Sequence, residues 1–365
     1  MEMRHTLIPV HAIKGRGSAS AIAHRFNRDT REDFDDGWST WEELAGDEAP
    51  PLRTQVTHEQ AKTILARNDS PDIPFTLSIN PYRGCEHGCI YCYARPSHAY
   101  LGLSPGLDFE TRIFVKPEAA KLLRSELSKP SYRCRPIAMG TNTDPYQPAE
   151  RNLKITRSVL EVLHEFRHPV TIVTKSALIR RDIDILAEMA ALNLASVAVS
   201  VTTLDRDLCR KLEPRAATPQ RRIETLKALS EAGIPTAVMA APMIPALNDS
   251  ELEHILEAAR AAGAAQAGYV LLRLPLEVAP LFQEWLEEHA PLKAQHVLSL
   301  LAESRGGKLY DPQWGQRMRG TGPYAELLRK RFDLACKRLG FKSQDGLDTS
   351  LFRAPPKAGD QLSLF

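Results

Sequence analysis

The sequence predicts an α/β fold in which a parallel sheet curls into a full or partial barrel. Six short runs rich in apolar and β-branched residues alternate with five longer helical stretches between residues 75 and 275. Pro117 and Pro219 stand where helices would begin, and Gly233 stands where a helix would end before a strand. Such alternation favours right-handed βαβ units, whose chemistry gathers at the carboxyl ends of the strands.

The elements follow in order along the chain. We predict strands over residues 75–80, 136–140, 170–174, 196–201, 236–240 and 269–274. We predict the intervening helices over residues 117–127, 152–166, 182–192, 219–232 and 251–262. Further helices are predicted over 281–289, 292–304 and 323–339, and a short helix over 58–67.

These elements divide the chain into four parts. Residues 1–70 are expected to form an irregular N-terminal extension, and residues 71–290 the α/β core. Residues 291–342 are expected to form a helical C-terminal part, and residues 343–365 a flexible tail.

The composition is that of a soluble globular protein, with 43% hydrophobic and 25% charged residues among 365. The net charge of +2 is too small to argue for nucleic acid by itself. No apolar run reaches the roughly 18 residues of a membrane helix, and no signal peptide is recognisable. We therefore expect a cytoplasmic protein that makes no membrane contact.

The central motif is a CxxxCxxC cluster formed by Cys85, Cys89 and Cys92. Such crowding in a cytoplasmic protein points to metal, and six cysteines are too few for a disulfide scaffold. Three thiolates can hold three irons of a 4Fe–4S cluster and leave the fourth iron open. The alternatives are a zinc site, with His87 or His98 as fourth ligand, and a ferredoxin-like electron carrier.

This motif, with Tyr91 just before the third cysteine and a strand before the first, resembles the radical S-adenosylmethionine (SAM) superfamily over residues 75–275. The resemblance implies a partial (β/α)6 barrel of the TIM type, a 4Fe–4S cluster and SAM. It implies that SAM chelates the open iron and that an electron from the reduced cluster releases a 5′-deoxyadenosyl radical, which abstracts hydrogen from a substrate. It also implies an electron donor such as flavodoxin or ferredoxin, and places Tyr91 near the adenine.

Polar residues at the predicted strand ends are the candidates for holding SAM. They are Thr141, Asn142, Thr143 and Asp144 after the second strand, Lys175 after the third, and Ser200 at the fourth. A cation and a hydroxyl at adjacent strand ends can bind a carboxylate. The four residues from Thr141 stand where the superfamily has a Gly-Gly-Glu-like motif. Capping and turn formation is the alternative role for such side chains.

Several stretches are similar to the spore-photoproduct-lyase-like, or DNA-repair-photolyase-like, group. They are residues 80–85, 141–147, 174–176 with 181–182, and 200–204. Spore photoproduct lyase reverses a thymine dimer by a radical route and uses a cysteine as hydrogen donor. Cys134 is the candidate donor here, and the alternative is a small apolar core residue, as we expect for Cys209 and Cys336.

The chain ends in a short apolar peptide that resembles the motif by which bacterial DNA repair and replication proteins dock on the sliding clamp. Its docking residues are Gln361, Leu362, Leu364 and Phe365. The alternative is a tail that folds back on its own core.

Three classes of function remain open. The first is a radical SAM enzyme, lyase-like, acting on DNA. The second is a radical SAM enzyme acting on RNA, a peptide or a small molecule. The third is a non-catalytic iron–sulfur or zinc module.

Overall fold

Six parallel strands form the centre of the fold, and each pairs with the next one along the chain. They are β3 (Leu77–Ile79), β6 (Ile137–Met139), β7 (Val170–Thr174), β8 (Ala195–Ser200), β9 (Thr236–Met243) and β10 (Gln266–Leu271). β2 (Leu65–Arg67) pairs antiparallel with β3, so β2 and β10 are the two edges of a seven-stranded sheet. The computed structural model describes residues 13–27, 52–343 and 346–355.

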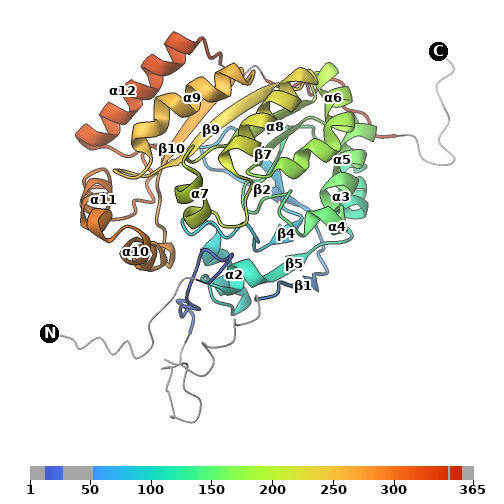
Figure 1. Cartoon of the computed structure of the whole chain (residues 1–365). Coiled ribbons are helices and arrows are strands. Elements are labelled where there is room, and N and C mark those ends of the chain that lie inside the picture. The colour runs from blue at the N-terminus through green and yellow to red at the C-terminus, as the bar shows by residue number, and fades with distance from the viewer. Residues whose placement is uncertain (1–12, 28–51, 344–345, 356–365) are drawn as a thin grey trace, which may run out of the picture.

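Helices cover the outer face of this sheet (Figure 1). They are α3 (Ala119–Leu127), α5 (Ile155–Glu165), α6 (Ile183–Ala191), α8 (Pro219–Glu231) and α9 (Leu252–Ala261). The core between the layers is apolar: α5 buries Val159, Leu160 and Leu163 at helical spacing. Val197 and Val199 of β8 are likewise buried. This architecture confirms the predicted α/β fold with a partial barrel.

The predicted helical C-terminal part is also present. α10 (Val278–His289) and α11 (Pro291–Glu303) form a pair, and α12 (Gly322–Leu339) packs beside α9 on the outside of the sheet (Figure 1). α12 ends at Gly340, whose φ of 70° is left-handed and suits glycine. No helix in the described ranges is long and apolar enough to span a bilayer.

The short helix predicted over residues 58–67 is wrong. Instead, β1 (Gln55–His58) pairs with β5 (Arg112–Val115), which also pairs with β4 (Tyr82–Arg83) in a second sheet. These strands escaped prediction because they are only two to four residues long, which is too short to establish a hydrophobic period, and because β1 is exposed throughout. β2 lies before the expected boundary at residue 70, yet it belongs to the main sheet.

The last described residues run along the amino edge of the main sheet. Asp348 N donates to Asn193 O, before β8, and Arg353 N donates to Phe166 O, before β7. The Phe352 ring packs against the rings of Tyr132 and His168. The chain therefore leaves the described structure on the side opposite to the carboxyl ends of the strands. The expected docking peptide, Gln361 to Phe365, lies outside the described residues.

The buried His168 side chain makes the free energy of unfolding depend on pH. The imidazole is fully buried, its Nε2 lies 2.7 Å from the Tyr132 hydroxyl, and burial lowers its pKa to about 4. Because the unfolded chain takes up this proton near pH 6.5 and the folded chain does not, stability falls as pH drops from about 6.5 towards 4. Between pH 7 and pH 5 the loss from this group is about 2 kcal/mol.

We expect His168→Gln to remove that share of the pH dependence. Urea denaturation of wild type and variant at pH 7 and pH 5 measures it. His254→Gln, at an exposed position on α9, is the matched control and should keep the wild-type difference. Equal pH differences in wild type and His168→Gln would contradict the prediction.

Candidate functional site

The three motif cysteines lie on one tight turn after β4, the cysteine loop (residues 84–92). Gly84 and Gly88 have φ values of 78° and 68°, and Cys92 N donates to Cys89 O at 3.2 Å. Burial is the main cause that raises the pKa values of Cys89 and Cys92, and neighbouring thiols of the motif raise them further. The three thiols therefore lie near enough to influence one another on this loop. That they hold the cluster stays a prediction.

The loop after β6 braces the cysteine loop from one side. Gln147 Nε2 donates to Gly84 O at 3.2 Å, and its Oε1 accepts from Glu86 N at 3.0 Å. Thr143 Oγ1 donates to Tyr82 O at 3.0 Å. The Thr143 side chain thus supports the cysteine loop, which differs from its expected role as a ligand of SAM.

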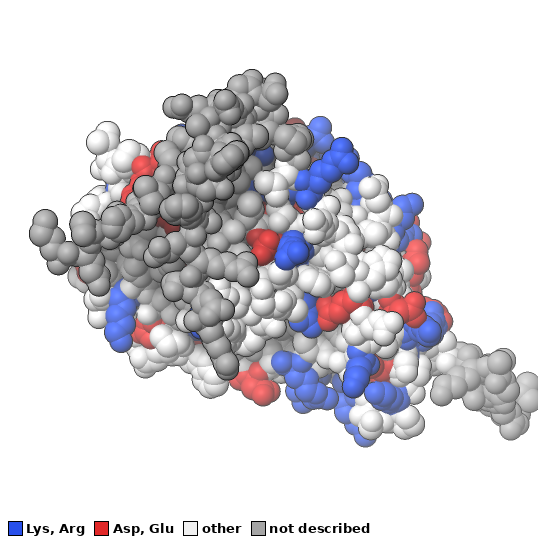
Figure 2. Space-filling view, turned by 90° about the horizontal axis from the view of Figure 1, so that it is seen from below, with Lys and Arg blue, Asp and Glu red and all other residues white. Residues whose placement is uncertain are grey.

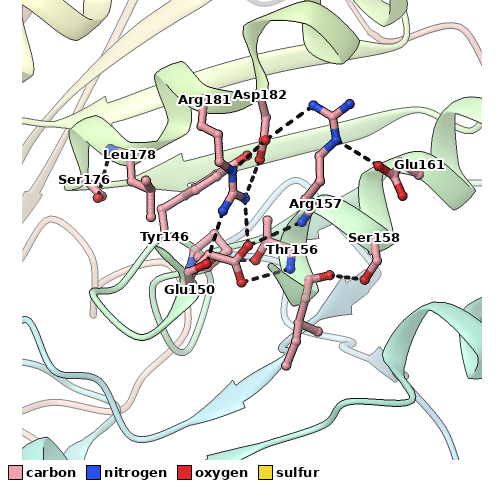
Figure 3. Close-up of polar contacts among 12 residues, drawn as sticks. Tyr146, Glu150, Thr156, Arg157, Ser158, Glu161, Ser176, Leu178, Arg181 and Asp182 are labelled. Atoms are coloured by element: carbon pink, nitrogen blue, oxygen red, sulfur yellow. Dashed lines mark hydrogen bonds and ion pairs between the residues drawn. The ribbon is translucent and has the colours of Figure 1, made fainter. Parts of the chain in front are cut away.

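A buried ionic network fixes this bracing loop in turn (Figure 3). Glu150, on α4 (Glu150–Leu153), accepts from Arg181 Nη2 at 2.8 Å and from Thr156 N at 3.0 Å. Arg181, on the 3-10 helix η2 (Ala177–Asp182), also pairs with Asp182. The Tyr82 hydroxyl donates to Glu150 as well. The Arg181–Asp182 pair singled out in the sequence is therefore part of the scaffold.

Asp144 joins three segments at the carboxyl edge of the sheet. Its carboxylate accepts from Thr174 Oγ1 at 2.7 Å and from Lys175 N at 2.8 Å, and lies 3.4 Å from His87 Nδ1. Burial alone would raise the pKa of Asp144. His87 and these hydrogen bonds outweigh burial and hold that pKa below its usual value. Both oxygens are engaged, so Asp144 positions the cysteine loop and the end of β7.

Lys175 brings a positive charge to the cysteines. Its Nζ lies 5.8 Å from the centroid of the Tyr91 ring and 3.9 Å from Glu213 Oε1. Burial lowers the pKa of Lys175, and the Cys89 thiol acts in the opposite direction, as expected for adjacent groups. Ser200, at the end of the neighbouring strand β8, is also buried. The cation and hydroxyl expected at adjacent strand ends are thus both present there.

The N-terminal segment crosses the cysteine loop from the other side. Gly17 N and Ser18 N each donate to the Glu110 carboxylate at 2.9 Å. Glu110, on α2 (Asp108–Thr111), is fully buried and also pairs with Arg95. A Cβ on Gly17 would lie 1.7 Å from Gly88 O, so only glycine fits this backbone-to-backbone contact.

The residues present fit a 4Fe–4S cluster with one open iron. The motif supplies three thiols, and Lys175 stands beside them to receive a carboxylate. Of the two histidines considered as zinc ligands, His87 pairs with Asp144 and also contacts the Cys85 thiol, while His98 Nε2 lies 3.0 Å from Arg112 O. Across the described ranges, no three or more His, Cys, Asp or Glu side chains form a group suited to hold one metal ion. The three cysteine thiolates of a 4Fe–4S cluster each bind a different iron, so they do not have to surround a single metal ion.

The model of the radical SAM superfamily matches residues 79–259, which begin at the end of β3 and contain the cysteine loop and the strands from β4 to β9. The chain belongs to the radical SAM superfamily. Its cofactors are accordingly a 4Fe–4S cluster and SAM. The predicted family, fold and cofactors are confirmed.

Relatives of this radical SAM protein extend over most of its length. An uncharacterized protein of Mycobacterium tuberculosis is 39% identical over 269 residues, which is 72% of this chain and 78% of that protein. A protein of Pseudomonas phage M6 named radical SAM Nalpha-GlyT isomerase is 26% identical over 71% of this chain and 52% of its own length. Spore photoproduct lyase in complex with a dinucleoside spore photoproduct matches in fold with a TM-score of 0.55, at 14% identity, over 78% of this chain and 79% of that chain.

Glu213 is a site residue that sequence reasoning missed. It follows α7 (Arg206–Leu212), is fully buried, and accepts hydrogen bonds from Tyr91, Thr202 and Arg222. These contacts fix the Tyr91 ring beside Lys175. The sequence around Glu213 is that of an ordinary helix end, so no sequence signal marked it as a site residue.

The remaining SAM candidates keep their side chains free. Thr141 O accepts from the Tyr93 hydroxyl, but no side-chain hydrogen bond in the described ranges occupies Thr141 or Asn142. Both stand at the carboxyl end of β6, on the same edge as Lys175. They remain predicted ligands of SAM.

The structure separates Cys134 from the other predicted site residues. It precedes β6, so it lies at the amino edge of the sheet, near Asp348 of the C-terminal segment. Along an extended strand, the six residues to Gly140 span about 20 Å. A hydrogen donor must reach the substrate radical, so this placement argues against the expected role of Cys134. Cys336 packs against the main core as expected, whereas Cys209 Sγ lies among charged groups, 3.7 Å from Glu213 Oε2.

Proposed function

We propose that this radical SAM enzyme acts on DNA and breaks or rearranges bonds at a nucleobase, as a lyase or isomerase would. The observation that carries the proposal is the likeness in fold to spore photoproduct lyase over 78% of the chain, including a complex of that enzyme with a dinucleoside photoproduct. The relationship to the phage Nalpha-GlyT isomerase supports a rearrangement chemistry for the same scaffold.

The side chains at the carboxyl edge suit this role. When bound, the cluster supplies the electron that splits SAM into methionine and a 5′-deoxyadenosyl radical. Lys175 is the group that would bind the SAM carboxylate, and Tyr91, fixed by Glu213, would border the adenine. Ile90 and Tyr91 pack into an apolar cluster with Leu212 and Leu272, which keeps water away from this side of the site.

The test is stimulation of SAM cleavage by DNA. We expect the anaerobically reconstituted protein, with a chemical reductant, to form 5′-deoxyadenosine at least about tenfold faster with a DNA substrate than without, because a bound substrate orients the reacting groups. Ultraviolet-irradiated DNA, untreated DNA, RNA and a peptide mixture are compared by mass spectrometry. Deuterium passing from labelled DNA into 5′-deoxyadenosine identifies the attacked position. Stimulation by RNA or peptide alone would refute DNA as the substrate.

Two partners complete the proposal. An electron donor such as flavodoxin or ferredoxin must reduce the cluster. Docking on the sliding clamp by Gln361, Leu362, Leu364 and Phe365 stays a prediction, because these residues lie outside the described ranges. Capture of the clamp by the full chain, lost when residues 361–365 are deleted, would support it.

A further inference from the structure

Three arginines gather at the carboxyl end of β10, and two of them are structural. Arg305 is buried and donates to Leu271 O at 3.2 Å and Leu272 O at 2.9 Å. Arg317 pairs with Asp72, in the connection between β2 and β3. Leu271 N also donates to Met318 O at 2.9 Å. The connection between α11 and α12, which contains Arg317 and Met318, therefore joins β10 to the opposite edge of the sheet.

Arg273 is the third arginine, and its charge is not neutralised. Within the described ranges, its guanidinium makes no ion pair or hydrogen bond. It is half-buried, and burial is the main cause that lowers its pKa. The carboxylate that acts on it, Asp72, is already paired with Arg317. A cation withdrawn from water without a partner costs free energy, which a bound anion would offset.

The surroundings of Arg273 place that charge next to the cysteine loop. Its guanidinium lies 4.6 Å from the centroid of the Tyr93 ring, and Tyr93 directly follows Cys92. The Tyr93 hydroxyl donates to Thr141 O, so the ring is held between the ends of β6 and β10. With 47% of its surface exposed, Tyr93 keeps this spot open to solvent.

The charge distribution on the face shown in Figure 2 is compatible with local recognition of an anion. In the face shown in Figure 2, basic and acidic side chains lie interspersed over the part that is not grey, with no field of one sign. The formal net charge of the chain is only +2. Affinity for a polyanion must then come from particular contacts.

We propose that Arg273, stacked on Tyr93, binds an oxyanion of the substrate, which under the proposed function is a phosphate of DNA. A planar guanidinium can rest on an aromatic ring while its N–H groups face a phosphate in bidentate fashion, which an ammonium cannot do. The contact would hold the nucleic-acid backbone beside the cysteine loop and so present the adjoining base to the edge where Lys175 and Tyr91 lie.

The experiment compares Arg273→Gln and Arg273→Lys with Arg329→Gln, which removes an exposed charge on α12. The reconstituted protein, saturated with SAM, is titrated by calorimetry with thymidine 5′-monophosphate, thymidine and inorganic phosphate. We expect wild type and Arg329→Gln to prefer the monophosphate to thymidine by about tenfold, and Arg273→Gln to lose that preference and phosphate binding. Arg273→Lys should be intermediate. SAM affinity, iron content and melting temperature should be unchanged.

Equal affinity of wild type for monophosphate and nucleoside would overturn the proposal. So would an Arg273→Gln variant that loses SAM affinity while keeping phosphate binding, because Arg273 would then serve the carboxylate of SAM. The result is separable from the proposed function. Loss of phosphate binding in Arg273→Gln, with no DNA stimulating SAM cleavage by wild type, would keep the oxyanion subsite and reject DNA.

Discussion

Cys89→Ala is expected to abolish SAM cleavage. The thiol lies in the cysteine loop, beside Cys92 and Lys175. With two protein ligands, the cluster should not assemble. The loss of 5′-deoxyadenosine formation should exceed the roughly 100-fold that removal of a second-shell partner costs. Iron and sulfide analysis and product mass spectrometry measure both effects.

Cys336→Ala is the matched control for this variant. Cys336 is half-buried on α12, and its removal should leave iron content and SAM cleavage at wild-type levels. A Cys89→Ala protein that binds its full iron and cleaves SAM would sink the assignment of the cysteine loop as the cluster site.

Glu110→Ala is expected to destabilise the protein by about 3–5 kcal/mol, the cost of leaving one buried charge without its partner. Arg95, which is fully buried, would lose its carboxylate. Arg95 also donates to Cys89 O at 2.9 Å, so the cysteine loop should loosen with it. Urea denaturation of the cluster-free protein measures the first effect, and the rate of iron loss to a chelator measures the second.

Two further variants test the cause. Glu118→Ala removes an exposed carboxylate that pairs with Lys121, and should change stability by no more than about 0.5 kcal/mol. Replacing both buried charges, as in Glu110→Leu with Arg95→Met, should recover part of the stability because no lone charge remains. If Glu110→Ala unfolds at the same urea concentration as Glu118→Ala, the ion pair does not stabilise the fold.

The main sheet was predictable because its strands are buried runs between clear turn and cap signals. β7 has the predicted bounds, 170–174, whereas β9 continues to Met243 and β10 begins three residues early. Such shifts arise because strand ends are set by pairing with neighbours, which composition does not record. The second sheet was not predictable, because its short strands depend on contacts between residues 55–58, 82–83 and 112–115.

The CxxxCxxC motif made the position of the cysteine loop predictable. The roles of the polar residues at strand ends were not predictable. Thr143 and Asp144 brace the cysteine loop, while Thr141 and Asn142 beside them have free side chains. All four look alike in sequence because bracing and binding need the same polar groups. Cys134 was misplaced because its spacing from the cysteine motif does not reveal which edge of the sheet it occupies.

The close contact between the Gly17 backbone and the Gly88 carbonyl limits how far the chain can be truncated from its N-terminus. A fragment starting at residue 71 would match the α/β core expected from sequence, but it would lack Gly17 and Ser18. Glu110 would lose two of its backbone hydrogen-bond donors. β3 would become an unpaired edge strand of the main sheet, because β2 would be missing. We therefore expect a fragment that folds and cleaves SAM to need residues 17–18 and β2 as well as the barrel.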